Sequence, residues 1–131
     1  MKIVFLIDDD PDDREIFEES LLSLDVPLKF EEATNGKEAV EKLSSSDFQK
    51  PDLIFLDINM PIMDGWQFLK HIKKDENFND IPVVIYSTSS SQEDKALAVK
   101  HQASEFITKP YSISSLRQEL KKTIFTFLSA E

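Results

Sequence analysis

Residues Leu53–Pro61, with the sequence LIFLDINMP, decide the fold that this chain is expected to adopt. The first four of them are apolar and follow Pro51 and Asp52, so they are short enough to form a strand buried on both faces. Asp57 comes directly after this run, and ligands bind at the carboxyl ends of the strands in an open α/β sheet. Taken alone, Asp57 is equally well explained as the opening of a turn, where Asp is common. The rest of the chain has to decide between these two interpretations.

Four more short apolar runs surround this stretch and alternate with segments of helical periodicity. The second run is the most polar, so we expect it nearer an edge of the sheet. Five strand-then-helix units predict a doubly wound α/β fold, with a five-stranded parallel sheet and helices on both faces. The expected strands are Ile3–Ile7, Leu28–Ala33, Leu53–Leu56, Ile81–Tyr86 and Glu105–Thr108.

Capping residues mark where the first two helices begin. Asp10 suits an N-cap and Pro11 the first turn, and this helix is expected to end before Pro27. Asp12 and Asp13 are favourable near the positive end of its dipole. The dipeptide Asn35-Gly36 is expected to form a turn ahead of the second helix.

Similar signals place the remaining helices. Asp64-Gly65 leads into the third helix. Ser90 and Glu93 have the spacing of a capping box, so the fourth helix is expected to run to about Gln102. The apolar positions expected to face the core are Ile16, Phe17, Leu21 and Leu24 in the first helix, Ala39, Val40 and Leu43 in the second, Trp66, Leu69 and Ile72 in the third, and Ile113, Leu116, Leu120, Ile124 and Phe127 in the last.

Length, charge and cysteine content narrow the class of protein. The 131 residues leave room for one domain with a full-sized core, and the absence of cysteine rules out disulfides and thiolate metal sites. A formal net charge of −10 argues against DNA, RNA and anionic membranes as direct partners, because all three are bound mainly through clustered Lys and Arg. The apolar run before Asp8 is only the five residues Ile3–Ile7, too short for a signal peptide or a membrane span, so we expect a cytoplasmic protein.

Polar side chains follow or close four of the expected strands. Asp8 and Asp9 follow the first, Asp57 the third, Ser87 the fourth and Lys109 the fifth. Because the carboxyl ends of parallel strands meet at one edge of a sheet, these side chains should lie close together. Close carboxylates repel each other by roughly 4 kcal/mol per pair at an effective dielectric of about 20. A hard divalent cation offsets that repulsion, and a site with few carboxylates suits Mg²⁺ better than Ca²⁺.

An aspartate, a Mg²⁺ ion, a lysine and a hydroxyl are the groups needed to phosphorylate the aspartate. The Asp57 carboxylate would attack phosphorus while the metal and the Lys109 ammonium take up charge on the phosphoryl oxygens. The Ser87 hydroxyl could then hold one of these oxygens. Each residue also has a plainer explanation: the acids as a solvated capping run, Lys109 as a surface lysine and Ser87 as a turn former. Five such coincidences at one sheet edge are much less plausible than one shared site.

With these residues the chain resembles the receiver domains of bacterial two-component response regulators. The resemblance covers essentially the whole chain and implies the flavodoxin-like strand order 2-1-3-4-5. Residues 1–131 would then be one receiver domain with no separate output domain, since the last helix is expected to end near Ser129. The motifs that carry the resemblance are Leu6–Pro11 (LIDDDP), Pro51–Pro61 (PDLIFLDINMP), Met63–Gly65 (MDG), Ile81–Ser87 (IPVVIYS) and Phe106–Pro110 (FITKP).

The resemblance implies a phosphorylation site and a metal site. Asp57 would accept a phosphoryl group from a sensor histidine kinase or a phosphotransfer protein. The metal would be Mg²⁺, bound directly by Asp9 and Asp57 and partly through water by Asp8. Asn59 would contribute its backbone carbonyl. Lys109 would contact the phosphoryl group.

The resemblance also implies a switch. Ser87 would supply the switch hydroxyl, and Phe106 would move inward when Ser87 is drawn toward the phosphoryl group, which alters the face formed by the fourth helix, the fifth strand and the last helix. Ser87 stands where Thr is commoner, and Phe106 lacks the phenolic oxygen of a Tyr, so we expect the switch to work without that hydrogen bond. Gln102 stands where the family usually has Gly. Either a left-handed residue there costs about 1 to 2 kcal/mol, or the turn takes another shape.

The finer resemblance is to small single-domain regulators, including those paired with phytochrome-type kinases. They share the acidic run Asp8–Asp13 and the stretch Ser87–Ser91. The downstream target is unknown, and a module that only drains phosphate from a kinase fits the sequence as well as one that drives an output. Phe125, Phe127 and Leu128 exceed what one core-facing stripe needs, so part of the last helix is either further core or an exposed patch for a homodimer or a target.

Several other residues have a plain interpretation. His71 and His101 lie among lysines and are expected at the surface, and neither is expected to bind metal or carry phosphate. Met60, Met63 and Trp66 are expected to pack near the pocket rather than to hold a cofactor.

Two other classes of protein fit the fold less well. An aspartate-nucleophile phosphatase needs a second carboxylate two positions after Asp57 as general acid, and Asn59 cannot donate that proton. A flavin carrier of the flavodoxin type needs a first loop that cradles a phosphate, and five aspartates there would repel one. We therefore expect a signalling receiver that catalyses only its own phosphotransfer and dephosphorylation.

Overall fold

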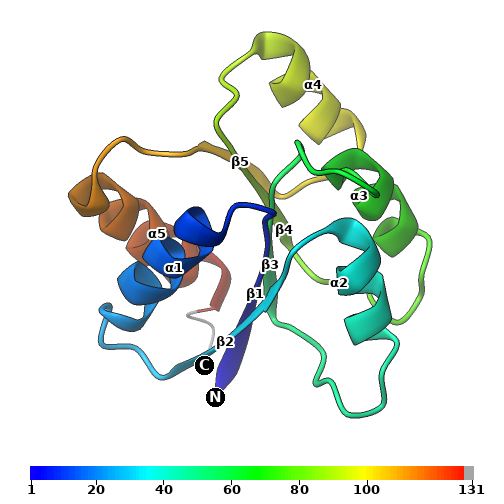
Figure 1. Cartoon of the computed structure of the whole chain (residues 1–131), viewed down its shortest axis with the longest axis horizontal. Coiled ribbons are helices and arrows are strands. Elements are labelled where there is room, and N and C mark those ends of the chain that lie inside the picture. Colours follow the sequence, from blue (N-terminus) through cyan, green and yellow to red (C-terminus); the bar gives the residue numbers. More distant parts are fainter. Residues whose placement is uncertain (129–131) are drawn as a thin grey trace.

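The computed structural model describes residues 1–128, which form a five-stranded parallel sheet and five helices (Figure 1). The strand order is β2-β1-β3-β4-β5, as expected from the resemblance, and the polar second strand lies at an edge. The strands are β1 Lys2–Ile7, β2 Leu28–Ala33, β3 Leu53–Leu56, β4 Val83–Ser87 and β5 Glu105–Thr108. The helices are α1 Pro11–Leu22, α2 Gly36–Leu43, α3 Gly65–Lys73, α4 Gln92–Lys100 and α5 Ile113–Leu128.

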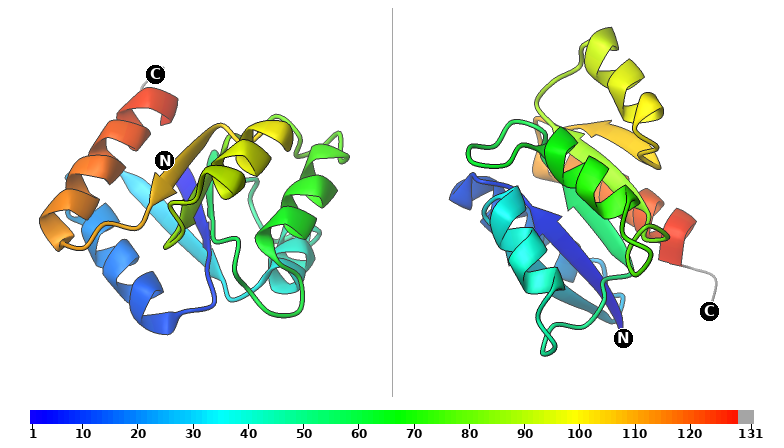
Figure 2. Two further views of the ribbon diagram at one scale, coloured as in Figure 1. Left: turned by 90° about the horizontal axis from the view of Figure 1, so that it is seen from above. Right: turned by 90° about the vertical axis from the view of Figure 1, so that its right-hand side faces the viewer.

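Helices cover both faces of the sheet, with α1 and α5 on one side and α2, α3 and α4 on the other (Figures 1 and 2). Alternate residues of each strand point to opposite faces, so β1 sends Val4 and Leu6 to the core under α1 and α5. The same strand sends Phe5 and Ile7 to the core under the other three helices. All four residues of β3 are buried, which confirms the strand predicted from the apolar run before Asp57.

The predicted strand limits hold closely, with one shift in β4. This strand runs from Val83 to Ser87 rather than from Ile81 to Tyr86, so Ser87 is its last residue. The backbone of Ser87 is therefore held in the sheet, where it pairs with Thr108 of β5. No helix within residues 1–128 is both long enough and apolar enough to pass through a lipid bilayer.

Two helix starts differ from the prediction. Asn35 does not form a separate turn but caps α2, and its side chain accepts a hydrogen bond from the backbone N–H of Glu38. The N-cap of α4 is Ser91 and not Ser90, because the Ser91 hydroxyl accepts the backbone N–H of Asp94. The N-cap predicted for α1 is confirmed, since the Asp10 side chain accepts backbone N–H groups of the first turn. Asp64-Gly65 leads into α3 as predicted, and Asp64 proves to be its N-cap.

The apolar stripes are narrower than predicted. Ile16 is 39% exposed and Ile113 is 59% exposed, so neither belongs to the core that was expected to include them. The end of α5 divides in the same way: Leu128 is buried, whereas Phe125 is 73% exposed. Phe127 is half-buried against the core beneath α1 and α5.

Gln102 takes the left-handed conformation, with φ of 67°, so the turn keeps the shape that favours glycine. Two hydrogen bonds explain why. The backbone N–H of Gln102 donates to the carbonyl of Val99, and that of Ala103 donates to the carbonyl of Ala98. This pair of bonds is a Schellman motif that closes the C-terminus of α4, and it requires a left-handed residue at this position. Helix α4 accordingly ends at Lys100, two residues before the predicted end.

Candidate functional site

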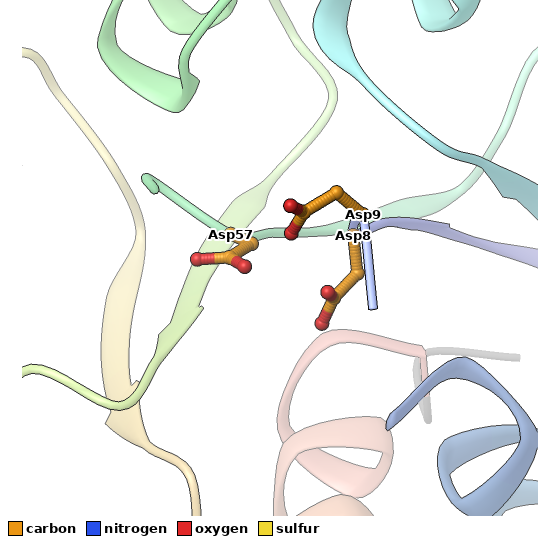
Figure 3. A group of neighbouring side chains, drawn as sticks. All are labelled: Asp8, Asp9 and Asp57. Carbon is orange, nitrogen blue, oxygen red and sulfur yellow. The ribbon is translucent and has the colours of Figure 1, made fainter. Parts of the chain in front are cut away.

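The carboxyl ends of β1 and β3 bring three carboxylates together (Figure 3). One oxygen each from Asp8, Asp9 and Asp57 lies within 4.8 Å of the others. Asp8 and Asp57 are buried, while Asp9 is exposed. The backbone fixes two of the three, because the N–H of Asp8 donates to the carbonyl of Ala33 in β2 and that of Asp57 donates to the last carbonyl of β1. The structure thus gathers the acids as the strand ends predicted.

Lys109 follows β5 and reaches across the sheet edge to these acids. Its Nζ lies 2.8 Å from Oδ2 of Asp8 and 3.7 Å from Oδ2 of Asp57. The side chain is only 10% exposed, and its backbone N–H donates to the carbonyl of Ser87 at 2.7 Å. The ammonium also lies 5.3 Å from the centre of the Tyr86 ring, within the range of a cation–π contact. Lys109 is therefore a positive charge within the site and not a surface lysine.

Burial dominates the electrostatics of the two inner acids. Desolvation raises the pKa of Asp57 to about 6, against the opposing effects of the backbone N–H of Asn59 and of the Lys109 ammonium. Desolvation also raises the pKa of Asp8, although its hydrogen bond to Lys109 acts in the opposite direction. The pKa of Lys109 is raised, because its contacts with carboxylates outweigh its own burial. One lysine thus leaves the inner acids short of positive charge.

Ser87 is fully buried, and its Oγ accepts a hydrogen bond from the backbone N–H of Ser89 at 3.1 Å. The loop after β4 is tied down at two further points. The hydroxyl of Thr108 donates to the carbonyl of Ser89, and the hydroxyl of Ser89 donates to Oδ2 of Asp94 at 2.6 Å. Phe106 of β5 is half-buried against the core under α2, α3 and α4. The hydroxyl and the aromatic ring therefore stand on neighbouring strands, joined by a hydrogen-bonded loop.

The loop from β3 to α3 shapes the other side of the site. The N–H of Asn59 donates to Oδ1 of Asp57 at 3.1 Å, which orients that carboxylate. Gly65 begins α3 against the backbone that follows Asp57, where an added Cβ would lie 2.5 Å from the carbonyl oxygen of Asp57 and 2.6 Å from Cα of Ile58. Only glycine fits so close an approach. The carbonyl of Asn59 that was expected to bind metal stays a prediction.

Comparison with known proteins places these features in a family. The family model described as the response regulator receiver domain matches residues 4–121. The chain belongs to this family. The sequence resemblance and its flavodoxin-like strand order are both confirmed.

Relatives of this receiver domain include much longer proteins. It is 38% identical over 122 residues to the sensor histidine kinase CheAY of Helicobacter pylori, covering 93% of this chain and 15% of that protein. It is 33% identical over 121 residues to the transcriptional regulatory protein PrrA of Mycobacterium tuberculosis, covering 90% of this chain and 48% of that protein. The receiver thus spans half or less of the length of these curated relatives.

Solved structures match over nearly the whole receiver. The phosphorylated cyanobacterial phytochrome response regulator RcpA superposes with a TM-score of 0.90 at 33% identity, covering 99% of this chain and 96% of that chain. The Mn²⁺-bound form of response regulator Rcp1 gives a TM-score of 0.88 over 100% of this chain and 97% of that chain, and at 24% identity this likeness is one of fold. The predicted similarity to phytochrome-associated regulators is confirmed. This CheY-like chain is a receiver module of two-component signalling.

Two contacts of the receiver site were missed from the sequence. Asp13 was assigned only to the helix dipole, yet its Oδ2 lies 2.8 Å from Nζ of Lys109. Asp13 stands four residues before the buried Phe17, so helical periodicity could have placed it on the side of α1 that faces the sheet. Arg14 was not considered, although its Nη1 donates to the carbonyl of Asp8 and its Nε pairs with Glu32. Arg14 thus ties α1 to the ends of β1 and β2.

The histidines of the receiver lie outside the acidic cluster. His71 is exposed, as predicted. His101 is half-buried, because its ring lies 5.7 Å from the Trp66 ring, and burial with the nearby Lys70 and Lys100 lowers its pKa. These contacts give His101 a packing role between α3 and α4.

Proposed function

We propose that this receiver domain switches by phosphorylation of Asp57, with a sensor histidine kinase or a phosphotransfer protein as the donor. The observation that carries the proposal is the gathering of Asp8, Asp9 and Asp57 within 4.8 Å, with the Lys109 ammonium 3.7 Å from Asp57. Lys109 joins the cluster from a position 101 residues beyond Asp8 in the chain. A solvated capping run would not be expected to bring in a largely buried lysine from the loop after β5.

The donor set fits Mg²⁺. Three carboxylates supply the hard oxygen ligands that this ion prefers, and Asp9 is exposed on the side open to water. Burial raises the pKa values of Asp8 and Asp57, and a cation bound between them would offset the cost of these buried charges. Asp8, Asp9 and Asp57 would hold the ion, together with the backbone carbonyl of Asn59. When bound, Mg²⁺ supplies charge neutralisation for the phosphoryl oxygens.

The residues of the chain then have distinct roles in the transfer. A carboxylate oxygen of Asp57 forms a bond to phosphorus as the bond between phosphorus and the donor histidine nitrogen breaks, and the electron pair of that bond stays on the imidazole. The Lys109 ammonium donates hydrogen bonds to the phosphoryl oxygens as their charge develops. The backbone N–H of Asn59 keeps the Asp57 carboxylate in place throughout.

The switch starts from the hydrogen bond between Ser87 Oγ and the N–H of Ser89. After phosphorylation the Ser87 hydroxyl donates to a phosphoryl oxygen, the loop after β4 shifts, and the half-buried Phe106 moves inward. The face formed by α4, β5 and α5 changes with it. Such a modification can move the equilibrium only by its different interaction with the two states, typically about 1 to 3 kcal/mol.

Output and assembly stay predictions. The relatives carry a similar receiver within longer proteins. The site itself is consistent both with a module that drives an output and with a phosphate sink. Exposed Phe125 on α5 suits a homodimer or a target contact. Unchanged sedimentation with and without a phosphoryl mimic would count against the homodimer.

Intact mass spectrometry after incubation with acetyl phosphate tests the proposal. Wild type should gain one phosphoryl group only when Mg²⁺ is present, and Asp57→Asn should gain none. Glu76→Gln is the matched control, since it removes one charge at an exposed position away from the cluster and should behave as wild type. Absence of any adduct on wild type, or an adduct that persists in Asp57→Asn, would contradict the proposed function.

A further inference from the structure

Besides Asp8, Lys109 contacts a second carboxylate, which lies in helix α1 and not at the end of a strand. Its Nζ lies 2.8 Å from Oδ2 of Asp13 and 2.8 Å from Oδ2 of Asp8, but 3.7 Å from Oδ2 of Asp57. Both hydrogen bonds that the ammonium makes to carboxylates thus go to acids other than the proposed phosphorylation site. Asp13 lies in the first turn of α1, which the N-cap Asp10 and Pro11 fix in place.

The surroundings of Lys109 allow its ammonium to change partners. A cavity of about 120 Å³ lies beside it and is lined in part by Asp13, Tyr86 and Lys109 itself. The Tyr86 ring supports the ammonium from one side at 5.3 Å. The ammonium therefore has space next to it on the side of Asp13. Its distance to Oδ2 of Asp57 is 3.7 Å, against 2.8 Å to Oδ2 of Asp13, so a small displacement would bring it within hydrogen-bond distance of Asp57.

The two hydrogen-bonded acids differ in what each would lose on release. Asp8 is fully buried, so no water can replace its hydrogen bond to Lys109. The side chain of Asp13 is 34% exposed, so water can solvate it once Lys109 leaves. An exposed carboxylate therefore gives up its partner at less cost than a buried one. Of the two bonds, the one to Asp13 is the one that can open during the reaction.

We propose that Asp13 is a positioning residue that holds Lys109 back from Asp57 in the unphosphorylated receiver. Phosphoryl transfer then requires the ammonium to leave Asp13 and donate to the phosphoryl oxygens. The inference rests on the proposed function of Asp57. It makes Asp13 a restraint on the rate of phosphorylation, acting through Lys109 and not on the phosphoryl group itself.

Rates of phosphorylation by acetyl phosphate at saturating Mg²⁺ test the restraint. Asp13→Asn should react about two- to fivefold faster than wild type, the range expected for the loss of a partly exposed ion pair. Asp13→Glu restores a carboxylate and should return the rate toward that of wild type. Asp12→Asn is the matched control, because it removes the same charge from the neighbouring, exposed position of the same helix turn.

A second measurement reports on Lys109 directly and needs no phosphorylation. The ¹⁵N resonance of the Lys109 ε-ammonium, identified by its loss in Lys109→Arg, should move in Asp13→Asn and stay in place in Asp12→Asn. A purely structural role of Asp13 in the first turn of α1 would not produce this difference.

The outcomes separate the inference from the proposed function. A rate in Asp13→Asn that equals or falls below that of wild type, on a receiver that does become phosphorylated at Asp57, would overturn the restraint. An unmoved Lys109 resonance would overturn the contact on which it depends. If wild type takes no phosphoryl group, the proposed function fails first, and the resonance still decides whether Asp13 holds the lysine.

Discussion

Neutralising Asp57 should stabilise the folded protein in the absence of a cation. Asp57 is 6% exposed, and burial raises its pKa from 3.8 to about 6. The folded protein therefore binds this proton more tightly than the unfolded chain does. Below pH 3.8 the carboxyl group of Asp57 is protonated and carries no buried charge, so the folded protein has its full stability there. This stability is lost as the pH rises through about 6, and above that pH the cost of the buried charge stays constant.

The size of the effect follows from the two pKa values. A difference of about two pH units between the folded and unfolded states corresponds to about 3 kcal/mol at pH 8. At pH 5 much of the folded protein still carries the proton on Asp57, so the cost is about half as large. Asp57→Asn removes the charge and keeps an oxygen that can accept the N–H of Asn59. Its gain in free energy of unfolding should therefore be near 3 kcal/mol at pH 8 and near half of that at pH 5, both to about 1 kcal/mol.

Urea unfolding at pH 5 and pH 8, with chelator present, measures this gain. Glu76→Gln removes one exposed charge and should change the unfolding free energy little at either pH. Adding Mg²⁺ at pH 8 should stabilise wild type and stabilise Asp57→Asn less, because the variant lacks one of the three carboxylates. A variant no more stable than wild type at pH 8, or a gain that does not shrink at pH 5, would refute the reasoning that the buried charge of Asp57 destabilises the folded protein.

Three further substitutions have definite expected effects on urea unfolding. Gly65→Ala should lower the free energy of unfolding by about 2 kcal/mol or more, because the new Cβ would lie 2.5 Å from the carbonyl oxygen of Asp57. It should also slow phosphorylation by acetyl phosphate, and unchanged stability would mean that the loop moves aside freely. Gln102→Gly should gain up to about 1 kcal/mol, because Gln102 has φ of 67°, and a loss of stability would contradict the strain assigned to that turn. Lys109→Met should lose about 3 kcal/mol at neutral pH without Mg²⁺, because Asp8 would be left buried without its ammonium partner, and a neutral result would show that the pair adds nothing.

The sequence predicted the sheet well because its signals are local. A strand buried on both faces reads as a continuous apolar run, and four of the five predicted strands match the observed limits to within one residue. Once the order of parallel strands is known, the positions of Asp8, Asp57 and Lys109 follow from where each strand ends. The candidate site was therefore predictable even though its members are far apart in the chain.

Contacts between side chains of a helix and residues distant in the sequence were harder to predict. Helical periodicity places Asp13 on the side of α1 that faces the sheet, but it does not show that Lys109, which follows β5, reaches this side chain. Ile16 was expected in the apolar stripe of α1, yet it is 39% exposed, whereas Phe17 and Leu21 of the same helix are fully buried.

The start of α4 shows a different limit. Two capping registers compete there, because Ser90 pairs with Glu93 at the same spacing at which Ser91 pairs with Asp94. The structure selects Ser91, in a loop whose Ser89 hydroxyl bonds to Asp94. That bond is fixed by the folded loop, so residue types alone could not separate the two registers.

The most direct test of the central claim is to locate the phosphoryl group chemically. After reaction with acetyl phosphate and Mg²⁺, borohydride reduces an aspartyl phosphate to homoserine, and peptide mass spectrometry shows which residue was converted. We predict homoserine at position 57 alone, with none when Mg²⁺ is withheld. Homoserine at position 8 or 9, or none at all on a folded protein, would contradict the account of Asp57 as the phosphoryl acceptor.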